Sequence, residues 1–426
     1  MSTNTDLAGS CLAHCEQYNR RHFLGFSAAF AASLLLPARS SLAGSRDPRF
    51  LFVILRGALD GLSAVMPVGD PDFAKMRGGF MDDVGQAGAP LPVGPMFALN
   101  PALKTLESLF ASQQATIVHA AATPYRERSH FDGQEVLESG LPGVTHGDSG
   151  WLNRAVAAMP LTSSLGLRDH MGLAVGSTVP LVMRGNVPVM SWTPEHLQPV
   201  TEDTISRLMS LYEARDPALA QALRQAGVMA NEAGGMAVAM TPGSGNHQKG
   251  KLGQGADAML TMADGAAKLL VRPDGPRIAT LSIDGWDTHA NEKPGTGRLG
   301  KLLGVLDQLF DRLRLSMAPV WNDTVIVVAT EFGRTVRING TEGTDHGTGT
   351  VAFLLGGAVK GGRVIADWPG LAENALYEHR DLKPTTDLRA VLKPILADHL
   401  GIDKRELEKS VFPASAQVAG LTGLVG

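Results

Sequence analysis

The chain has 426 residues, of which 44% are hydrophobic, 19% charged and 5% aromatic, and its formal net charge is −4. This hydrophobic fraction, near the globular average, excludes a wholly disordered chain. A nucleic-acid-binding protein usually carries a strongly basic surface, so the slightly acidic charge argues against a nucleic-acid partner.

The N-terminal region has the features of an export signal. Two arginines open the motif RRHFL at 20–24, and an apolar stretch follows over 25–36. That stretch is shorter than the roughly 20 residues that cross a bilayer as a helix. The small residues of SLA at 41–43 form a cleavage site. We therefore predict a twin-arginine signal peptide over 1–43 and a mature chain that begins at Gly44, with an uncleaved membrane anchor as the alternative.

This prediction has consequences for location and chemistry. A twin-arginine signal implies the twin-arginine translocase as a partner and a periplasmic or otherwise exported protein. Both cysteines lie before residue 43, so the predicted mature chain has no thiolate and no disulfide. No apolar stretch after residue 43 is long enough to span a membrane, so we expect no membrane span in the mature chain.

The mature chain alternates between apolar strands and amphipathic helices. Strands are predicted over 50–55, 115–118, 277–283, 324–329 and 351–355, and helices over 129–139, 150–159, 299–315 and 387–400. This alternation is typical of an α/β fold whose mostly parallel sheet is covered by helices on both faces.

Residues from about 160 to 255 interrupt the alternation. Two helices are predicted there, over 203–214 and 217–230, followed by a Gly-, Met- and Ser-rich stretch over 234–250. We interpret residues 44–426 as one α/β domain, with a helical and loop insertion or cap at about 160–255.

Acidic residues and histidines follow the predicted strands. They are Asp60 after the first strand, Asp284, Asp287 and His289 after the third, Glu331 after the fourth, and His346 just before the last. Parallel strands end at one edge of a sheet, so these side chains are expected to converge there. Carboxylates and imidazoles together suit Zn²⁺, Mn²⁺ or iron. Taken singly, each residue also fits a turn, a helix cap or an ordinary ion pair, such as one between Glu331 and Arg334. His119 lies inside a predicted strand, so we expect a core residue there.

Several motifs together resemble a known family. They are RGALDGL at 56–62, SHF at 129–131, GWDTH at 285–289, EFGRT at 331–335, DHG at 345–347 and PTTDL at 384–388. Over residues 50–400 the chain resembles domain-of-unknown-function family 1501, whose members are often exported by the twin-arginine pathway. That family belongs to the alkaline phosphatase superfamily, which includes sulfatases and phosphodiesterases. The resemblance implies an alkaline-phosphatase-like three-layer sandwich and a metal-dependent hydrolase of phosphate or sulfate esters, with a small anionic ester as substrate.

The resemblance also implies a metal site. Asp60 and Glu331 would bind one ion, and either Asp284 or Asp287, with His289 and His346, would bind another. The cofactor implied is one or two divalent ions, Zn²⁺ or Mn²⁺.

The remaining site residues follow from the same resemblance. Ser129, at the start of a predicted helix, would be the nucleophile, or it caps that helix. His130 would be a metal ligand, an acid for the leaving group or a structural residue. Arg126, Arg128 and Arg334 would clamp ester oxygens.

The chain departs from the superfamily pattern in two places. Phosphatases usually have Asp-His after the fourth predicted strand, whereas this chain has Glu331-Phe332, and Phe cannot bind a metal. The sulfatase motif Cys-x-Pro-x-Arg is absent from the sequence. Two functions are therefore carried forward: an exported metal-dependent ester hydrolase, or a non-catalytic periplasmic binding or assembly protein on a retained fold.

Overall fold

The computed structural model of the chain describes residues 46–160, 171–176, 178–194, 221 and 251–426. The predicted signal peptide at 1–43 lies outside the described residues. The same holds for the helices expected at 203–214 and 217–230, apart from residue 221, and for the stretch at 234–250. Residues 47–426 fold as one unit.

Within the described residues, a nine-stranded sheet forms the centre of this unit. The strand order is β11-β5-β10-β9-β1-β8-β6-β7, with β12 pairing to β5. The strands are β1 (Arg49–Arg56), β5 (Ala115–Ala122), β6 (Gly172–Val175), β7 (Met190–Trp192), β8 (Ile278–Asp284), β9 (Thr324–Thr330), β10 (Thr350–Leu355), β11 (Arg363–Ile365) and β12 (Thr386–Asp387). Only β10 among them pairs antiparallel, with β5 and β9. The sheet is thus mostly parallel, which confirms the predicted fold class.

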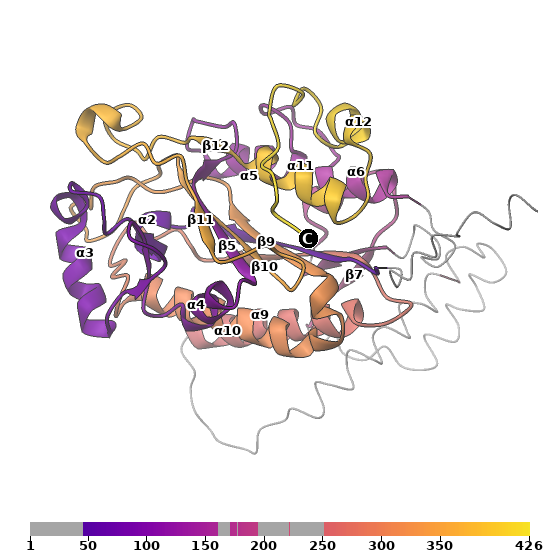
Figure 1. The fold of residues 1–426 in the computed structure, drawn as a ribbon, viewed down its shortest axis with the longest axis horizontal. Coiled ribbons are helices and arrows are strands. Elements are labelled where there is room, and N and C mark those ends of the chain that lie inside the picture. Colours follow the sequence, from indigo (N-terminus) through magenta and orange to yellow (C-terminus); the bar gives the residue numbers. More distant parts are fainter. Residues whose placement is uncertain (1–45, 161–170, 177, 195–220, 222–250) are drawn as a thin grey trace, which may run out of the picture. The chain divides into compact units, whose positions relative to one another are not determined.

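Helices cover both faces of the sheet (Figure 1). One face carries α4 (Lys104–Ala111), α9 (Lys251–Leu270) and α10 (Arg298–Ser316), and the other carries α5 (His130–Ser139), α6 (Trp151–Ala158) and α11 (Leu388–Asp398). Alternate residues of β1 explain this layering: Leu51, Val53 and Leu55 pack in the core that includes α10, and Phe50, Phe52 and Ile54 pack in the core that includes α6 and α11. A strand buried on both faces reads as a continuous apolar run.

Smaller elements complete the unit. A second sheet has the order β2-β4-β3. The remaining elements are α2 (Gly61–Ala64), β2 (Val65–Met66), α3 (Phe73–Ala87), β3 (Leu91–Pro92), β4 (Ala98–Leu99), α12 (Lys404–Glu406), the 3-10 turns Leu181–Met183, Ala318–Asp323 and Glu373–Ala375, and the π-helical turn Leu407–Val411.

The segment expected to be an insertion at about 160–255 contributes to the sheet. Residues 172–175 form β6, which pairs parallel with β8, and residues 190–192 form β7 at the end of the strand order. Both strands are short, and this explains why their apolar residues gave no clear strand pattern.

The ends of three central strands lie at the same level of the sheet. Arg56 of β1 is in register with Asp284 of β8, and Leu55 is in register with Thr330 of β9. The loops that follow come close together at Gly57, which has φ 115° and where a Cβ atom would lie 2.6 Å from the backbone nitrogen of Asp287. A side chain cannot fit there, so Gly57 lets the loop after β1 pass against the loop after β8.

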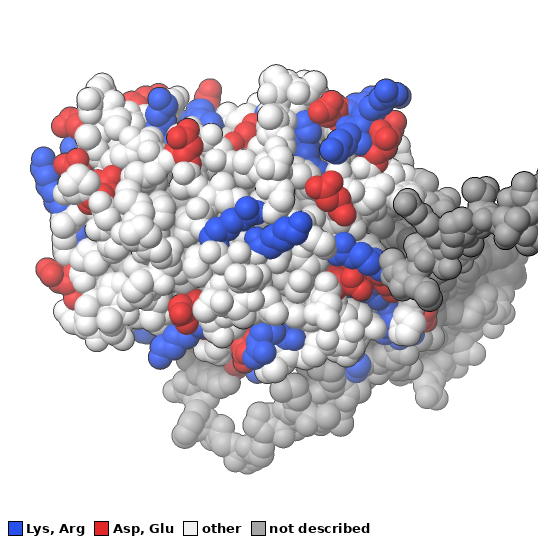
Figure 2. All heavy atoms as spheres, viewed as in Figure 1, with Lys and Arg blue, Asp and Glu red and all other residues white. Residues whose placement is uncertain are grey.

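The face of the described residues shown in Figure 2 has no broad area of one charge. Figure 2 shows acidic and basic side chains interspersed on the face in view, which agrees with the small net charge. Among the described residues, no helix is both long and apolar enough to cross a membrane.

Candidate metal centre

Three imidazoles surround one carboxylate oxygen at the edge where the central strands end. Oδ1 of Asp287 lies 3.1 Å from Nε2 of His289, 3.4 Å from Nε2 of His346 and 3.6 Å from Nε2 of His130. The Nε2 atoms of His289 and His346 are 2.9 Å apart. Asp287 and His289 follow β8, His346 precedes β10, and His130 begins α5.

Each imidazole is held from behind by a hydrogen bond at its other nitrogen. Nδ1 of His130 lies 2.8 Å from Oε1 of Glu331, and Nδ1 of His289 lies 3.2 Å from Oδ1 of Asp345. Nδ1 of His346 lies 2.9 Å from the carbonyl oxygen of Arg128, a residue in the left-handed region with φ 63°. Carbonyl and carboxylate oxygens accept, so each imidazole in its neutral form carries its proton on Nδ1 and has a free lone pair on Nε2. This outer arrangement is the usual one around metal-binding histidines.

The inner atoms fit a divalent ion. A tetrahedral ion with bonds of about 2.1 Å holds its ligand atoms roughly 3.4 Å apart, close to the separations measured around Asp287. Nε2 of His130 is buried and has no hydrogen-bond partner, although a buried polar atom is normally satisfied. His130, Asp287 and His346 therefore form a group able to hold a metal ion, and His289 contacts two of its three members.

Glu331 is the buried anchor behind His130. Its Oε1 accepts from the backbone N–H of Gly57 at 2.8 Å and from Gln134 at 3.1 Å, besides His130, and its Oε2 accepts from Thr330 at 2.8 Å. Burial acts to raise the pKa of Glu331, but these hydrogen bonds outweigh it and the pKa is lowered. The charged carboxylate in turn raises the pKa of His130.

Burial and nearby charges shift the pKa values of Asp287 and His346, and an aromatic ring packs against His130. Burial acts to raise the pKa of Asp287, but the hydrogen bond and charge of Arg334 lower it below its usual value. The pKa of His346 is lowered by burial and by the nearby charge of His130. Phe332, at the position where phosphatases carry a histidine, is buried and stacks on His130 with ring centroids 5.0 Å apart. The ring thus supports the imidazole instead of offering a second ligand.

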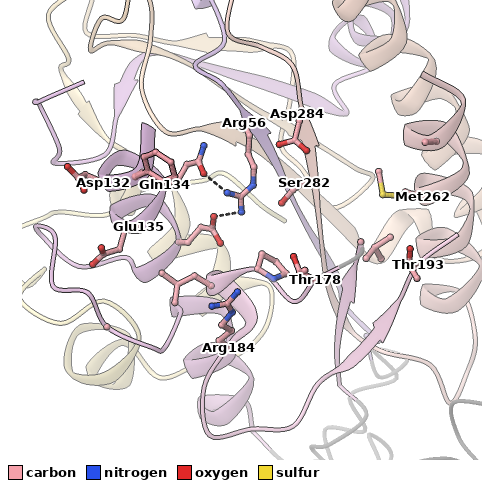
Figure 3. A pocket seen from close by; sticks show the side chains of 18 of the residues that line it. Arg56, Asp132, Gln134, Glu135, Thr178, Arg184, Thr193, Met262, Ser282 and Asp284 are labelled. Atoms are coloured by element: carbon pink, nitrogen blue, oxygen red, sulfur yellow. Dashed lines mark hydrogen bonds and ion pairs between the residues drawn. The ribbon is translucent and has the colours of Figure 1, made fainter. Parts of the chain in front are cut away.

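A cavity of about 840 Å³ is lined by Phe131, which follows His130, and by Gln134, whose amide donates to Glu331 (Figure 3). Its walls come from α5, α9, the ends of β1 and β8, and the segment after β6. Asp284, expected as an alternative metal ligand to Asp287, is exposed and lines this cavity with Arg56 and Ser282. Phe131, next to His130, is 89% exposed at its rim.

A family profile described as a protein of unknown function (DUF1501) matches residues 108–411, about 70% of the chain. The chain belongs to the DUF1501 family. This confirms the resemblance that the motifs indicated. No curated protein matches the chain.

Solved structures similar to this DUF1501 protein include sulfatases and other alkaline phosphatase superfamily proteins. Ps i-CgsB, solved in complex with k-i-k-neocarrahexaose, is 12% identical with a TM-score of 0.42, over 88% of this chain and 77% of that one. A putative sulfatase from Bacteroides thetaiotaomicron is 9% identical with a TM-score of 0.38, over 88% and 73%. The phosphonate monoester hydrolase of Agrobacterium radiobacter is 12% identical with a TM-score of 0.37, over 84% and 74%. At these scores the likeness is distant, and the fold class rests on the sheet described above.

Asp60, expected as a metal ligand in this DUF1501 protein, lies in a different buried cluster. Both of its oxygens accept from Arg77, at 2.5 and 3.1 Å, and both side chains are 1% exposed. Burial acts to raise the pKa of Asp60, but the charge of Arg77 lowers it. Glu292 lies beside this pair, and burial together with the charge of Asp60 raises its pKa well above the usual value. A buried cation therefore already occupies the position next to Asp60.

The three arginines expected to clamp the ester are engaged within the protein. Arg126 donates to the carbonyl oxygens of Thr123 and Tyr125, and Arg128 donates to Asp381 and Glu378. Arg334 is buried and, besides Asp287, donates to carbonyl oxygens of residues 57, 58, 286 and 344. Arg334 thus ties the loops that follow β1, β8 and β9 to one another.

Ser129 is the N-cap of α5. Its Oγ accepts from the backbone N–H of Asp132 at 3.5 Å, and the helix begins at the next residue. The capping alternative left open for Ser129 thus matches its placement.

Sequence reasoning did not single out several residues around the centre. Asp345 stands in the DHG motif beside His346, and this adjacency was an available signal. Gln134 follows His130 by four residues, which is the spacing of neighbours on one helix face. Arg77 and Glu292 carry no local pattern, because they reach Asp60 only through the tertiary fold.

Proposed function

We propose that this DUF1501 protein is an exported, metal-dependent hydrolase of phosphate or sulfate esters. In this proposal one divalent ion, Zn²⁺ or Mn²⁺, is bound by His130, Asp287, His289 and His346. The observation that carries it is the convergence of three Nε2 atoms on Oδ1 of Asp287, each imidazole being held by an outer oxygen. Thiol-free sets of imidazoles and a carboxylate occur in catalytic zinc sites, which keep a coordination position open; an ion held by all four residues would take water or an ester oxygen as a fifth ligand.

The chain's own residues prepare the site. When bound, the ion would polarise an ester oxygen and lower the pKa of water. Glu331 keeps the proton of His130 on Nδ1, so that Nε2 is available to the ion. Arg334 holds the Asp287 carboxylate, and Phe332 keeps water from the buried side of His130. The cavity lined by Gln134 and Arg56 would take the organic part of the ester.

Two features favour water, rather than Ser129, as the nucleophile. The Ser129 hydroxyl accepts a helix-capping hydrogen bond, and no Asp-His pair follows β9 to hold a second ion. A single ion that activates water suffices for hydrolysis.

A second candidate function is a non-catalytic periplasmic binding or assembly protein. The observation that favours it is the full engagement of Arg126, Arg128 and Arg334 by internal partners, which leaves none of these three to clamp an ester. In that case the metal centre would pin the loops together as a structural site.

Turnover of model esters distinguishes the two functions. We expect protein loaded with Zn²⁺ or Mn²⁺ to hydrolyse at least one of p-nitrophenyl phosphate, bis-p-nitrophenyl phosphate and p-nitrophenyl sulfate. Chelation should abolish this turnover, and added metal should restore it. A His346→Ala variant is the matched control for a contaminating hydrolase. Protein that binds metal and turns over none of the three esters would favour the binding function.

We also propose export by the twin-arginine translocase, supported by the order of charged, apolar and cleavable segments within residues 1–43. Replacing Arg20 and Arg21 together by lysine should leave the protein in the cytoplasm. Unchanged recovery from the periplasmic fraction would contradict this route.

A further inference from the structure

Three residues of α5 lie along one face of the helix, next to the metal centre. His130, Gln134 and Glu138 are spaced by four residues, so they follow one another along the same side. His130 faces Asp287, and Glu138 is a buried residue in the wall of the cavity. Gln134, between them, also lines the cavity.

Hydrogen bonds join these residues into a chain. Nε2 of Gln134 donates to Oε1 of Glu331 at 3.1 Å, and the same oxygen lies 2.8 Å from Nδ1 of His130. Oε1 of Gln134 accepts from Arg56 at 2.5 Å, and the other terminal nitrogen of Arg56 bonds Glu138. Figure 3 draws both contacts of Arg56 as dashed lines at the cavity wall.

The chemistry of the two end groups allows only one orientation of the Gln134 amide. A guanidinium donates and cannot accept, so the amide oxygen must face Arg56. A carboxylate accepts and cannot donate, so the amide NH₂ must face Glu331. Arg56 therefore fixes the orientation of the Gln134 amide, and the amide NH₂ in turn helps to fix the Glu331 carboxylate. Successive hydrogen bonds of this kind polarise one another.

We propose that Arg56 and Gln134 are positioning residues of the metal centre. Arg56 fixes Gln134, Gln134 helps to fix Glu331, and Glu331 orients the imidazole of His130 and sets its basicity. This inference rests on the proposed function, because it requires that His130 binds a metal. Arg56 is the outermost residue in this series of hydrogen bonds. Its side chain is 23% exposed and lies in the wall of the cavity expected to hold the substrate.

A double-mutant cycle on metal affinity tests the chain of contacts. The variants are Arg56→Met, Gln134→Met and both together, made in a Glu138→Gln background so that loss of Arg56 does not strand a buried charge. The readouts are the dissociation constant for Zn²⁺, by chelator competition, and the visible absorption spectrum of bound Co²⁺. Arg184→Met removes another arginine from the same cavity and is the matched control.

The expected results follow from the order of the contacts. Each single variant should weaken Zn²⁺ binding about tenfold, the lower end of effects for outer partners. The double variant should be no weaker than either single one, because Arg56 acts through Gln134. The Co²⁺ spectrum should shift alike in all three, whereas Arg184→Met should bind Zn²⁺ within twofold of its parent.

Three results would overturn the inference. Additive losses of Zn²⁺ affinity in the double variant would mean that Arg56 and Gln134 act independently. Unchanged Zn²⁺ affinity in either single variant would show that this residue does not position the centre. In both cases the metal centre itself would stand. Absence of Zn²⁺ binding by the parent protein would instead overturn both the proposed function and this inference.

Discussion

The Nε2 atoms of His289 and His346 lie 2.9 Å apart, and both lie within hydrogen-bond range of Oδ1 of Asp287. The two residues are 57 positions apart and belong to loops on different strands, so only the tertiary fold joins them. Nδ1 of His289 is hydrogen-bonded to Asp345, and Nδ1 of His346 is hydrogen-bonded to the carbonyl oxygen of Arg128. Two imidazoles that present lone pairs to the same point are expected around a bound ion.

Removing an imidazole ligand should lower metal affinity. We expect His130→Ala and His346→Ala each to weaken Zn²⁺ binding by more than the ~10–100-fold typical of an outer partner. Metal competition with a chromogenic chelator measures this, and His379→Ala, an exposed histidine whose Nδ1 contacts the carbonyl oxygen of Glu373, is the control. Full affinity in both ligand variants would show that the centre is misassigned.

Replacing Glu331 by Gln should weaken metal binding without removing the site. The variant keeps the shape of the side chain but loses the charge that orients His130, so we expect a loss of about 10–100-fold in Zn²⁺ affinity. It should also lower stability, because Glu331 is buried and accepts four hydrogen bonds. Titration calorimetry checks the affinity, and a value equal to that of the unmodified protein would assign Glu331 a purely structural role.

Two substitutions of Ser129 separate its capping role from a nucleophilic role, because both remove the hydroxyl and only one keeps a helix cap. Ser129→Ala should cost about 0.5–1 kcal/mol of stability, because the cap is lost, while ester turnover persists. Ser129→Asn should recover that stability, because Asn is a good N-cap, and it also lacks a nucleophilic hydroxyl. Denaturant unfolding and initial rates measure the two effects. Loss of turnover in both variants, with metal retained, would restore Ser129 as the nucleophile.

Substitutions in the buried cluster of Asp60, Arg77 and Glu292 should have interdependent effects on stability. Glu292→Gln should cost less stability than Asp60→Asn, because burial and the charge of Asp60 raise the pKa of Glu292 and so disfavour its charged form. Asp60→Asn together with Glu292→Gln should cost about 3–5 kcal/mol, since Arg77 is then buried without a countercharge. Asp60→Asn alone should cost less than the double variant, because Glu292 can ionise in its place. Denaturant unfolding measures these changes, and loss of bound metal in Asp60→Asn would return Asp60 to the ligand set.

His119 should make stability depend on pH. Burial lowers its pKa to about 4, from 6.5, and its ring is fully satisfied when neutral: Nε2 donates to Val65 and Nδ1 accepts from the backbone N–H of Ala120. The unfolded chain therefore binds a proton first, so this stability is present above pH 6.5 and is lost as the pH falls towards 4. The loss amounts to roughly 3 kcal/mol. His119→Gln should flatten the unfolding free energy over this interval, and identical pH profiles would contradict the assignment.

Much of the fold could be predicted because its signals are local. The buried strands β1 and β9 contain unbroken apolar runs, β8 is largely apolar, and α10 repeats leucines at helical spacing. The antiparallel direction of β10 could not be predicted, since its apolar run reads the same in either direction. His119, expected in the core from its place inside a strand, is completely buried.

The candidate site was predictable only in part. The position of His289 and His346 near strand ends was enough to place them at one edge of the sheet. Asp60 also follows a strand, but in the folded protein it pairs with Arg77 of α3. No local sequence pattern predicts that contact. That Asp287, and not Asp284, lies among the histidines likewise required the structure, because the two carboxylates are only three residues apart and Asp284 faces the cavity.

The most direct test of the account is the metal content of the purified protein. The full chain, prepared without chelator, incubated with excess Zn²⁺ and desalted, should retain one ion per chain by elemental analysis. The His346→Ala variant treated in the same way should retain much less. Two tightly bound ions per chain would contradict the single centre at Asp287, and no retained ion would contradict the metal-dependent function itself.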